Sequence, residues 1–361
     1  MKKVIFISAL AIAAAVSCTK SDIVDTKFGN DVIGFESYVG RDAQTKASVE
    51  TATTLQATGF GVYGFYTGKD SFGGANSVIN LWANDEVKYD ATKSVWAPTT
   101  PKYWTNETDK YTFLAYAPYG NENITPKGNL DEKVPAVEFE VPIELEDQVD
   151  LLYSNNLQDT KRGSTALVFN HALSRITVKA KDNIPSDDFT YKVYGVQLKG
   201  QFINKSTLTL WNNDWASVDA TEQNYVIKAY DSEVVNGVET PKVEGVALTE
   251  TDYDFATYVK KSEANANYLM VIPVSVTNAE LIVTYTTSYK GQESTPMTKA
   301  VKVTEEFMQG KAYSLNLAFE PNTTDTITFT ISVTEWKAEG ENAADGSETT
   351  VTPNPSNPVV A

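Results

Sequence analysis

The sequence predicts an all-β protein built from two tandem β-sandwich domains with little helix. Aromatic and β-branched residues favour strands, and the chain contains 19 Tyr, 15 Phe and many Thr and Val residues. Short stretches of alternating apolar and polar residues recur with turn residues between them, which is typical of sandwiches. No segment keeps a helical period over three turns. A length of 361 residues gives room for two domains.

The start of the chain has the pattern of a lipoprotein signal peptide. Residues 1–3 are a short basic start, and residues 4–16 are an apolar run that is too short for an ordinary membrane span. Residues 15–18 read AVSC, a lipobox pattern in which Cys18 receives diacylglycerol. We therefore expect residues 1–17 to be removed as a signal peptide. The alternative is an ordinary secretory signal with an incidental cysteine.

Charge limits the partners of the mature chain. Loss of two lysines with the signal peptide leaves 28 of the 30 basic groups against 47 acidic ones, a formal charge of −19. Such a surface repels phosphate backbones and anionic membranes, so we expect no nucleic-acid partner. Attachment is then expected through lipid on Cys18, with residues 18–31 as a flexible leash. Thr19 after the cysteine fits the outer-membrane pattern of Gram-negative lipoproteins.

An N-terminal β-sandwich domain is expected over residues 32–183. Val32–Val39 reads as its first strand and is followed by a polar connector that contains Arg41 and Lys46. Proteases cut such exposed connectors. Arg41 is therefore a candidate processing residue and Lys46 a weaker one, the alternative being a solvated arginine in a linker. Later strands are expected at residues 60–66, 84–89, 111–119, 137–141 and 150–153.

Residues 167–180 form a central strand-rich stretch in which the apolar phase changes. Apolar residues fall on odd positions up to Leu173 and on even positions from Ile176 onward. Because strand side chains alternate between faces, this change requires a bulge or a strand that passes between two layers. The stretch contains His171, the only histidine of the chain. It shares a face with Phe169, so we expect a structural histidine that is hydrogen-bonded within the core.

A C-terminal β-sandwich domain is expected over residues 184–336, with the boundary in the polar segment 181–188. Residues 303–309 are expected to give one short helical turn. The last strand shows the cleanest alternation, with Ser and Thr on one face and four apolar residues on the other: Ile327, Phe329, Ile331 and Val333. Residues 337–361 are acidic and contain three prolines, so most of this tail is expected to be disordered.

Few residues support catalysis or metal binding. A histidine-dependent nucleophile would have to use His171, because the chain has no other histidine and its only cysteine carries the lipid. For the same reason, a zinc site lacks nitrogen and sulfur ligands. Calcium could use the carboxylates of Asp182, Asp187 and Asp188, although loop carboxylates are usually solvated. We expect no enzymatic activity, no metal and no cofactor.

Two tryptophans close together in the sequence are candidate glycan contacts. Trp211 and Trp215 flank three polar residues and are expected to be the most exposed tryptophan pair. Aromatic rings can stack on sugar rings. More often, however, such residues belong to the core or form cross-strand pairs.

An ordered set of short motifs resembles the fimbrillin family over roughly residues 16–336. Besides the lipobox and the early strand, the set contains FGVY at 60–63, YTFLAYAP at 111–118, DLLY at 150–153, FNHALS at 169–174, GKAY at 310–313 and VTEW at 333–336. Each motif is short and common by itself. The ordered set is more specific than its members.

The resemblance implies a lipoprotein precursor of a pilus subunit with two β-sandwich domains of transthyretin-like type. In that family an arginine-specific protease removes the lipidated N-terminal segment with its first strand, and a strand of a neighbouring subunit fills the vacated groove. This is β-augmentation, in which a donor supplies both ladder hydrogen bonds and apolar side chains. Carried over, Arg41 would be the cleavage residue. The exchanged strand would act through Val32, Ile33, Phe35 and Val39.

The C-terminus departs from the family pattern of stalk subunits, which donate a C-terminal strand. Here the residues after Trp336 are rich in proline. Either Thr326–Trp336 swings out to donate, with the apolar face of Ile327, or the chain accepts a strand and does not donate. The second case would suit a tip or otherwise terminal component, whereas an uncleaved, lipidated chain would suit an anchor.

The sequence therefore predicts a non-enzymatic surface protein that acts as a structural or adhesive fimbrial subunit. Its expected partners are other fimbrial subunits, outer-membrane lipid through Cys18, and a host protein or glycan. The alternative is a surface glycan-binding lipoprotein of a polysaccharide-uptake system.

Overall fold

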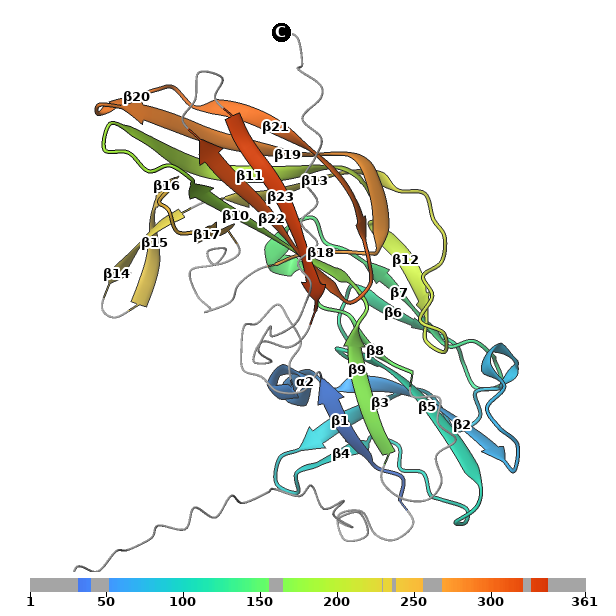
Figure 1. The fold of residues 1–361 in the computed structure, drawn as a ribbon. Coiled ribbons are helices and arrows are strands. Elements are labelled where there is room, and N and C mark those ends of the chain that lie inside the picture. Colours follow the sequence, from blue (N-terminus) through green and yellow to red (C-terminus); the bar gives the residue numbers. More distant parts are fainter. Residues whose placement is uncertain are drawn as a thin grey trace, which may run out of the picture.

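The computed structural model describes residues 32–39, 52–155, 165–228, 230–235, 238–255, 268–320 and 326–336. These residues are almost all in strands (Figure 1), which confirms the prediction of an all-β chain. Helix in the described part is confined to α2 (Ala52–Thr58) and two 3-10 turns, Gly74–Asn76 and Leu145–Asp147. Among the described residues, no helix combines the length and apolar character needed to span a membrane.

The N-terminal strands close into a barrel instead of remaining two open sheets. Its members follow the order β1-β4-β3-β2-β5-β8-β9 around the barrel. Their bounds are β1 (Phe35–Val39), β2 (Phe60–Gly68), β3 (Trp82–Asp90), β4 (Val95–Pro98), β5 (Lys110–Ala117), β8 (Leu152–Ser154) and β9 (Thr165–His171). Aromatic rings fill the interior, among them Phe60, Trp82 and Phe113. Closure depends on β1, which joins the two ends of the sheet.

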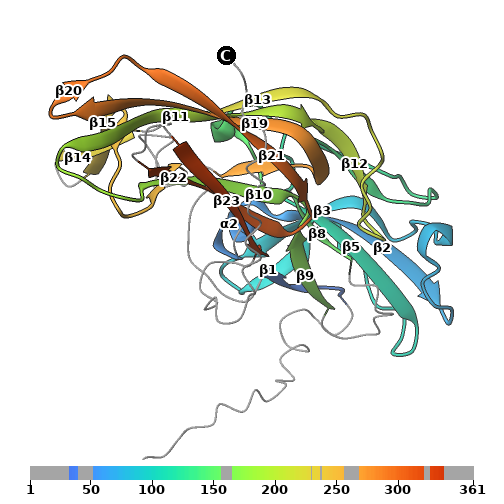
Figure 2. The ribbon, with the colours of Figure 1, turned by 45° about the horizontal axis from the view of Figure 1, so that its top comes forward.

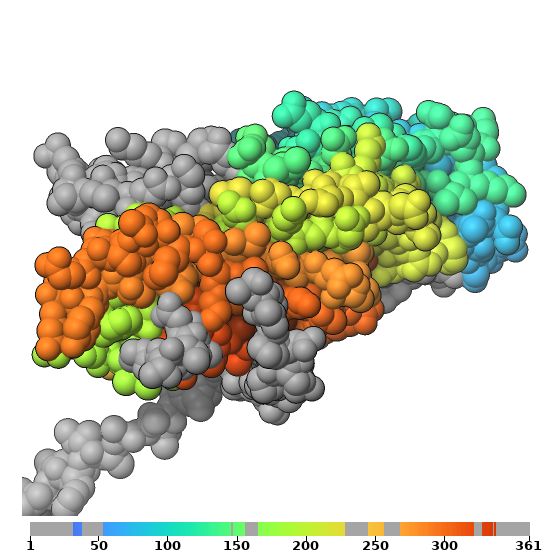
Figure 3. Space-filling model, turned by 90° about the horizontal axis from the view of Figure 1, so that it is seen from above, coloured from blue at the N-terminus to red at the C-terminus, as the bar shows by residue number. Residues whose placement is uncertain are grey.

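A small sheet connects the two halves of the sequence. It contains β6 (Ile124–Lys127), β7 (Ala136–Glu140) and β12 (Lys205–Thr209) in the order β12-β7-β6. β12 comes from the C-terminal half but pairs with β7 of the N-terminal half over five register positions. Figure 3 shows the residues around β12 lying against the N-terminal half. A strand from the C-terminal half of the sequence therefore completes a sheet of the N-terminal half.

The C-terminal strands form two sheets packed face to face (Figures 1 and 2). The first sheet contains β10 (Ser174–Asp182), β17 (Tyr253–Asp254), β18 (Leu269–Val271), β22 (Lys311–Glu320) and β23 (Thr326–Glu335). The second contains β11 (Phe189–Phe202), β13 (Thr221–Lys228), β16 (Val246–Ala247), β19 (Val274–Tyr289), β20 (Gln292–Glu293) and β21 (Met297–Phe307). A hairpin of β14 (Tyr230–Val235) and β15 (Val238–Glu244) lies apart from both sheets. β21 includes most of residues 303–309, so the prediction of a helical turn there was wrong.

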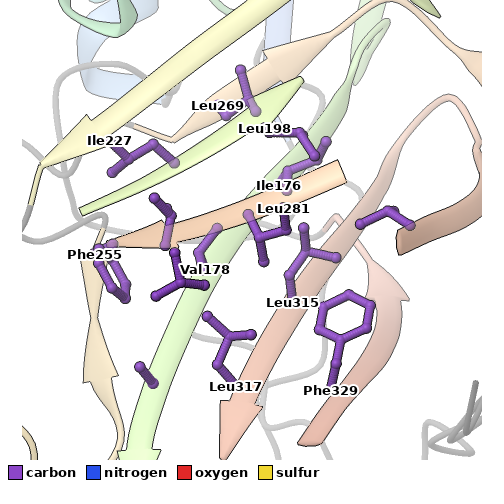
Figure 4. Packing of buried hydrophobic residues seen from close by; sticks show 14 of the residues in the cluster. Ile176, Val178, Leu198, Ile227, Phe255, Leu269, Leu281, Leu315, Leu317 and Phe329 are labelled. Atoms are coloured by element: carbon purple, nitrogen blue, oxygen red, sulfur yellow. The ribbon is translucent and has the colours of Figure 1, made fainter. Parts of the chain in front are cut away.

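The core of this sandwich is built from alternating residues of facing strands. Ile176 and Val178 of β10 meet Leu281 of β19 and Leu315 of β22 (Figure 4). Both β10 and β22 bury every second residue along most of their length. This period of two is the pattern that strand geometry imposes when one face of a sheet is buried.

The central stretch changes sheets between β9 and β10. β9 belongs to the barrel and β10 to the C-terminal sandwich, with buried Ala172 and Leu173 between them. The change of apolar phase therefore marks a chain that passes from one layer to another, one of the two explanations that the sequence allowed. The crossing at residues 172–173 lies before the expected domain boundary at residues 183–184, because β10 pairs with β22 and β18.

Candidate strand-exchange site

β1 occupies a gap between β4 and β9 in the barrel wall. It pairs in parallel with β9 over five register positions, from Phe35 opposite Thr165 to Val39 opposite Phe169. Its other side has a single register position with β4, Phe35 opposite Trp96. One further backbone bond, from Ile33 N to Lys102 O at 2.9 Å, holds the residues before it. β1 thus closes the barrel through a short ladder.

The side chains of this segment are deeply buried despite the short ladder. Ile33 is fully buried and Phe35 is 1% exposed. The Phe35 ring lies 5.2 Å from Phe113, 5.8 Å from Trp82 and 6.0 Å from Phe60, measured between centroids. Such tilted and edge-to-face contacts add to the free energy gained by burying the ring. Ile33 and Phe35 therefore fill the space that the other barrel strands leave open.

The remaining residues predicted for the exchanged segment contribute less to the described structure. Val32 is half-buried and forms an isolated bridge with Tyr103. Val39 ends β1, and only its backbone pairing is described. Cys18, Arg41 and Lys46 lie outside the described residues.

β23, the candidate donor strand, lies at the end of its sheet. It pairs with β22 over ten register positions, and the sheet order places no described strand beyond it. Ile327, Phe329 and Ile331 are buried in the sandwich core, with Val333 packed against its edge. Trp336, directly after β23, is also buried. The predicted apolar face is therefore present, and it is already in use within the chain.

His171 lies in a buried polar and aromatic cluster where the barrel meets the sandwich. Its Nδ1 is 2.9 Å from Oδ2 of Asp150, which is 1% exposed. The imidazole stacks on Trp336 with the centroids 4.0 Å apart and the planes 2° from parallel. The guanidinium of Arg175 lies 4.4 Å from the centroid of Tyr268 and 5.5 Å from that of Trp336. This environment matches the structural histidine that the sequence suggested.

Trp211 and Trp215 are half-buried and do not form an exposed pair. Both pack against the cluster of buried residues between the two halves. The indole Nε1 of Trp215 donates to Ala172 O at 3.2 Å, at the crossing from β9 to β10. A Cβ on Gly74 would lie 3.2 Å from the Trp211 ring, so this ring covers a turn. They are nevertheless the most exposed of the described tryptophans, as the sequence predicted, because the other four are buried. The pairing of β12 with β7 keeps both rings partly covered.

The acidic residues considered for calcium do not converge. Asp182 is 2% exposed and its Oδ1 accepts a hydrogen bond from the Ile184 backbone at 3.1 Å. Burial raises the pKa of the Asp182 carboxyl. Asp187 and Asp188 are exposed. Within the described ranges, no three His, Cys, Asp or Glu side chains are placed to share a metal ion.

Three features of the structure were missed in the sequence. The outward face of β10 carries Arg175, Lys179 and Lys181. The signal in the sequence was that these cations occupy odd positions, between the apolar residues at even positions. Asp109 gathers four side-chain partners before β5. The signal for it was the spacing of Asn106 and Asp109, which suits an Asx turn. The sequence identified Trp336 only as the end of the last strand. Its stacking on His171 could not be predicted, because only the tertiary fold brings the two residues together.

Comparison with known proteins defines the class of protein that carries this barrel and sandwich. The model of the family described as Fimbrillin-like matches residues 45–336. The chain therefore belongs to the fimbrillin-like family.

Proteins similar to this chain include a curated fimbrium subunit and a fimbrial protein of known structure. The fimbrium subunit Fim1C of Phocaeicola vulgatus is 27% identical over 225 residues, which are 54% of this chain and 58% of the relative. The chain thus spans less than two thirds of the curated relative that it matches. The crystal structure of a fimbrial protein from Bacteroides vulgatus has a TM-score of 0.66 at 22% identity, over 85% of this chain and all of that one. This second likeness concerns the fold alone.

Proposed function

We propose that the chain is a structural or adhesive subunit of a cell-surface fimbria, assembled by strand complementation after β1 is displaced. The position of β1 carries this proposal. It has one register position with β4 and five with β9, yet it supplies Ile33 and Phe35 to the barrel core. An extended segment of another subunit with apolar side chains at the same alternation can replace both its ladder bonds and its side chains.

Loss of β1 without a replacement is costly. Complete burial of one such apolar side chain contributes about 1.5–3 kcal/mol, and two of them come from this segment. The rings of Phe60, Trp82 and Phe113 would face water, and β4 and β9 would present unpaired backbone groups. A donor strand removes both costs at once. This gives the processed chain a reason to associate.

The chain accepts a strand and does not donate β23. Withdrawal of β23 would break its ten-position ladder with β22 and expose Ile327, Phe329 and Ile331. It would also remove Trp336 from its stack on His171. These contacts support a tip or accessory position in the fimbria. A chain that is left uncleaved would keep its lipid and serve as an anchor.

Processing at Arg41 can be tested on the purified precursor. An arginine-specific protease should remove the segment up to Arg41, and species that resist detergent should appear on an unboiled gel when other fimbrial subunits are present. Arg41→Lys should block both effects, and the matched variant Arg162→Lys should block neither. Cleavage after Arg41 without any polymer, with or without other subunits, would overturn strand complementation.

A peptide of residues 32–39 provides a direct competitor. Added in excess to the cleaved chain together with other fimbrial subunits, it should reseal the barrel and suppress the polymers. The same peptide with Phe35→Asp should leave them unchanged, because a carboxylate cannot enter the aromatic core without a large desolvation cost. Equal effects of the two peptides would contradict the assigned groove.

Lipidation of Cys18 is the expected first step of export. Cells grown with labelled palmitate should incorporate the label into the chain and retain it in the outer-membrane fraction. Cys18→Ala should abolish the labelling and release the chain from the membrane. A labelled Cys18→Ala variant would show that the lipid is attached elsewhere.

A further inference from the structure

We propose that the outer face of the C-terminal sheet binds an acidic polysaccharide. The observation behind this is a groove of about 590 Å³ on the solvent side of β10, β22 and β23. Its lining is formed by basic, hydroxyl and amide side chains, although the chain has a net charge of −17. The site is separate from β1 and its partners, so it does not depend on strand complementation.

The cations of the groove form a row along β10. Arg175, Lys179 and Lys181 share the outward face, because strand residues two positions apart point to the same side. At about 3.3 Å per residue the row extends over about 20 Å. That length suits an extended polymer with repeated anionic groups better than a single small anion.

These cations have no carboxylate partner among the described residues. None of the three forms an ion pair within 4.0 Å there, and Nε of Arg175 is buried without a hydrogen-bond partner. Asp252 lines the groove at the end where Lys181 lies. It is the one acidic residue among the described residues that line the groove. Asp254 of β17 also lies opposite Lys179 in the sheet register, so three cations stand against two carboxylates and the groove keeps an excess of one positive charge. Lys179 and Lys181 are the cations left for a polyanion, because the guanidinium of Arg175 already contacts the rings of Tyr268 and Trp336.

The sheet register places rows of polar side chains beside the middle of this row of cations. Lys179 lies opposite Asn316 of β22, which lies opposite Thr330 of β23. The neighbouring row runs from Thr177 through Ser314 to Ser332. Because neighbouring strands lie about 4.8 Å apart, each row of three residues extends over about 10 Å across the sheet. One edge of the groove thus offers charge and the other offers hydroxyl groups.

Several of these polar groups are held in place by hydrogen bonds within the sheet. Asn316 Oδ1 accepts from Ser314 Oγ at 2.8 Å, and its Nδ2 donates to Ser332 Oγ at 3.3 Å. Thr177 Oγ1 donates to Tyr313 O at 3.1 Å. Groups fixed in this way lose little side-chain entropy when a ligand binds.

The placement favours a polysaccharide over an acidic peptide. An extended peptide gains most of its affinity by pairing its backbone with a sheet edge. This groove lies on the face of the sheet, where the backbone groups are already paired between strands. Recognition must come from side chains, and hydroxyl and amide groups match the hydroxyl groups of a sugar chain while the cations match its acidic substituents.

Binding can be measured with the whole mature chain and four immobilised polymers, namely polygalacturonate, dextran sulfate, uncharged dextran and polyglutamate. We expect binding to polygalacturonate, which carries carboxylates, or to dextran sulfate, which carries sulfates, and none to uncharged dextran. Which of the first two binds distinguishes carboxylate from sulfate as the acidic group. Affinity should fall as salt is raised, because salt screens charge attraction at the surface.

Two matched double variants assign the binding to the groove. Lys179→Gln/Lys181→Gln should lower the affinity about tenfold or more, a loss of about 1.4 kcal/mol. Lys299→Gln/Lys302→Gln, on β21 outside the groove, has the same change of charge and should bind like the parent chain. Unfolding curves of all three proteins confirm that the substitutions leave the fold intact.

Several outcomes would overturn the proposal. Equal losses in the two double variants would mean attraction by net charge and no groove. Binding of uncharged dextran, or no binding to either acidic polymer, would exclude an acidic polysaccharide. Binding of polyglutamate as tight as that of the acidic polysaccharides would point to an acidic peptide as the partner.

Discussion

Asp109 shows how one carboxylate can organise the start of a strand. Its Oδ1 lies 2.9 Å from Nζ of Lys69, and its Oδ2 accepts hydrogen bonds from Tyr66, Thr105 and Asn106. The Lys69 ammonium, followed by these donors, holds the pKa of Asp109 well below its usual range. The bond to Asp109 also raises the pKa of the Tyr66 hydroxyl. The first shift favours the charged form of Asp109 in the folded state, and the second favours the protonated Tyr66 that donates to it.

The first prediction concerns the pH dependence of this contact. A carboxyl whose pKa is lowered by folding stabilises the protein above its unfolded pKa of about 3.9, and this contribution fades as pH falls toward the folded pKa. Asp109→Asn should therefore lower the urea midpoint of unfolding equally at pH 7 and pH 5, and less at pH 3. Asp70→Asn, at an exposed position, is the matched control and should have little effect at any of these pH values. A loss that is independent of pH would contradict the role of the charge.

At the scale of the element, β1 is held by side chains more than by its ladder. Phe35 contacts three rings of the barrel core, whereas β4 contributes one register position. Phe35→Ala should destabilise the chain by about 3–5 kcal/mol, as large-to-small changes of buried rings do. Ser37→Ala, two residues further on the same face of the strand but only half-buried, should stay within about 0.5 kcal/mol of the parent. Equal unfolding midpoints for the two variants would show that backbone pairing holds β1.

A second prediction at this scale concerns the close approach of β11 and β19. A Cβ on Gly200 would lie 2.8 Å from Cβ of Ala279 and 2.9 Å from its Cα. Gly200→Ala should therefore cost about 1–3 kcal/mol in chemical unfolding through overpacking. Gly73→Ala, where the nearest atom is 3.5 Å away, is the control and should be nearly neutral. A neutral Gly200→Ala would mean that the two strands can separate there without loss.

The elements that sequence could predict are those with a local signal. Alternation located β9, β10 and β23, because a period of two directly reflects one buried face. It failed for α2, which is short, and for β21, whose residues are mostly exposed or half-buried. Barrel closure was also missed, because it requires β1 to pair with β9 far along the chain. Such pairing leaves no trace in the local pattern of either strand.

Part of the candidate sites could likewise be predicted from the sequence, and part could not. Phe35 and Ile33 were predicted as part of an exchanged strand, and the structure places both in the barrel core. The groove on β10 was not predicted, because its charge depends on which strands lie beside it. Trp211 and Trp215 were expected to be the most exposed tryptophans, and they are the most exposed of those described, although the pairing of β12 with β7 leaves both only half-exposed.

At the scale of the whole molecule, the two halves share part of their core. One cluster of buried residues draws on both the barrel and the sandwich, with Leu114 and Tyr116 from β5 and Met270 and Ile272 from the C-terminal half. The crossing residues Ala172 and Leu173 belong to the same cluster. Burial of apolar surface between the halves should make their unfolding cooperative.

Trp336 is the residue on which this cooperativity can be tested. It joins the end of β23 to the barrel by stacking on His171, and its backbone N donates to Gly310 O at 2.8 Å. Trp336→Ala should cost about 3–5 kcal/mol and separate the unfolding of barrel and sandwich into two transitions. Hydrogen exchange followed by mass spectrometry should then show different opening free energies for peptides of β5 and β22. Trp336→Phe keeps a ring over His171 and should retain one transition. A single transition in Trp336→Ala would mean that the small sheet of β12, β7 and β6 couples the halves by itself.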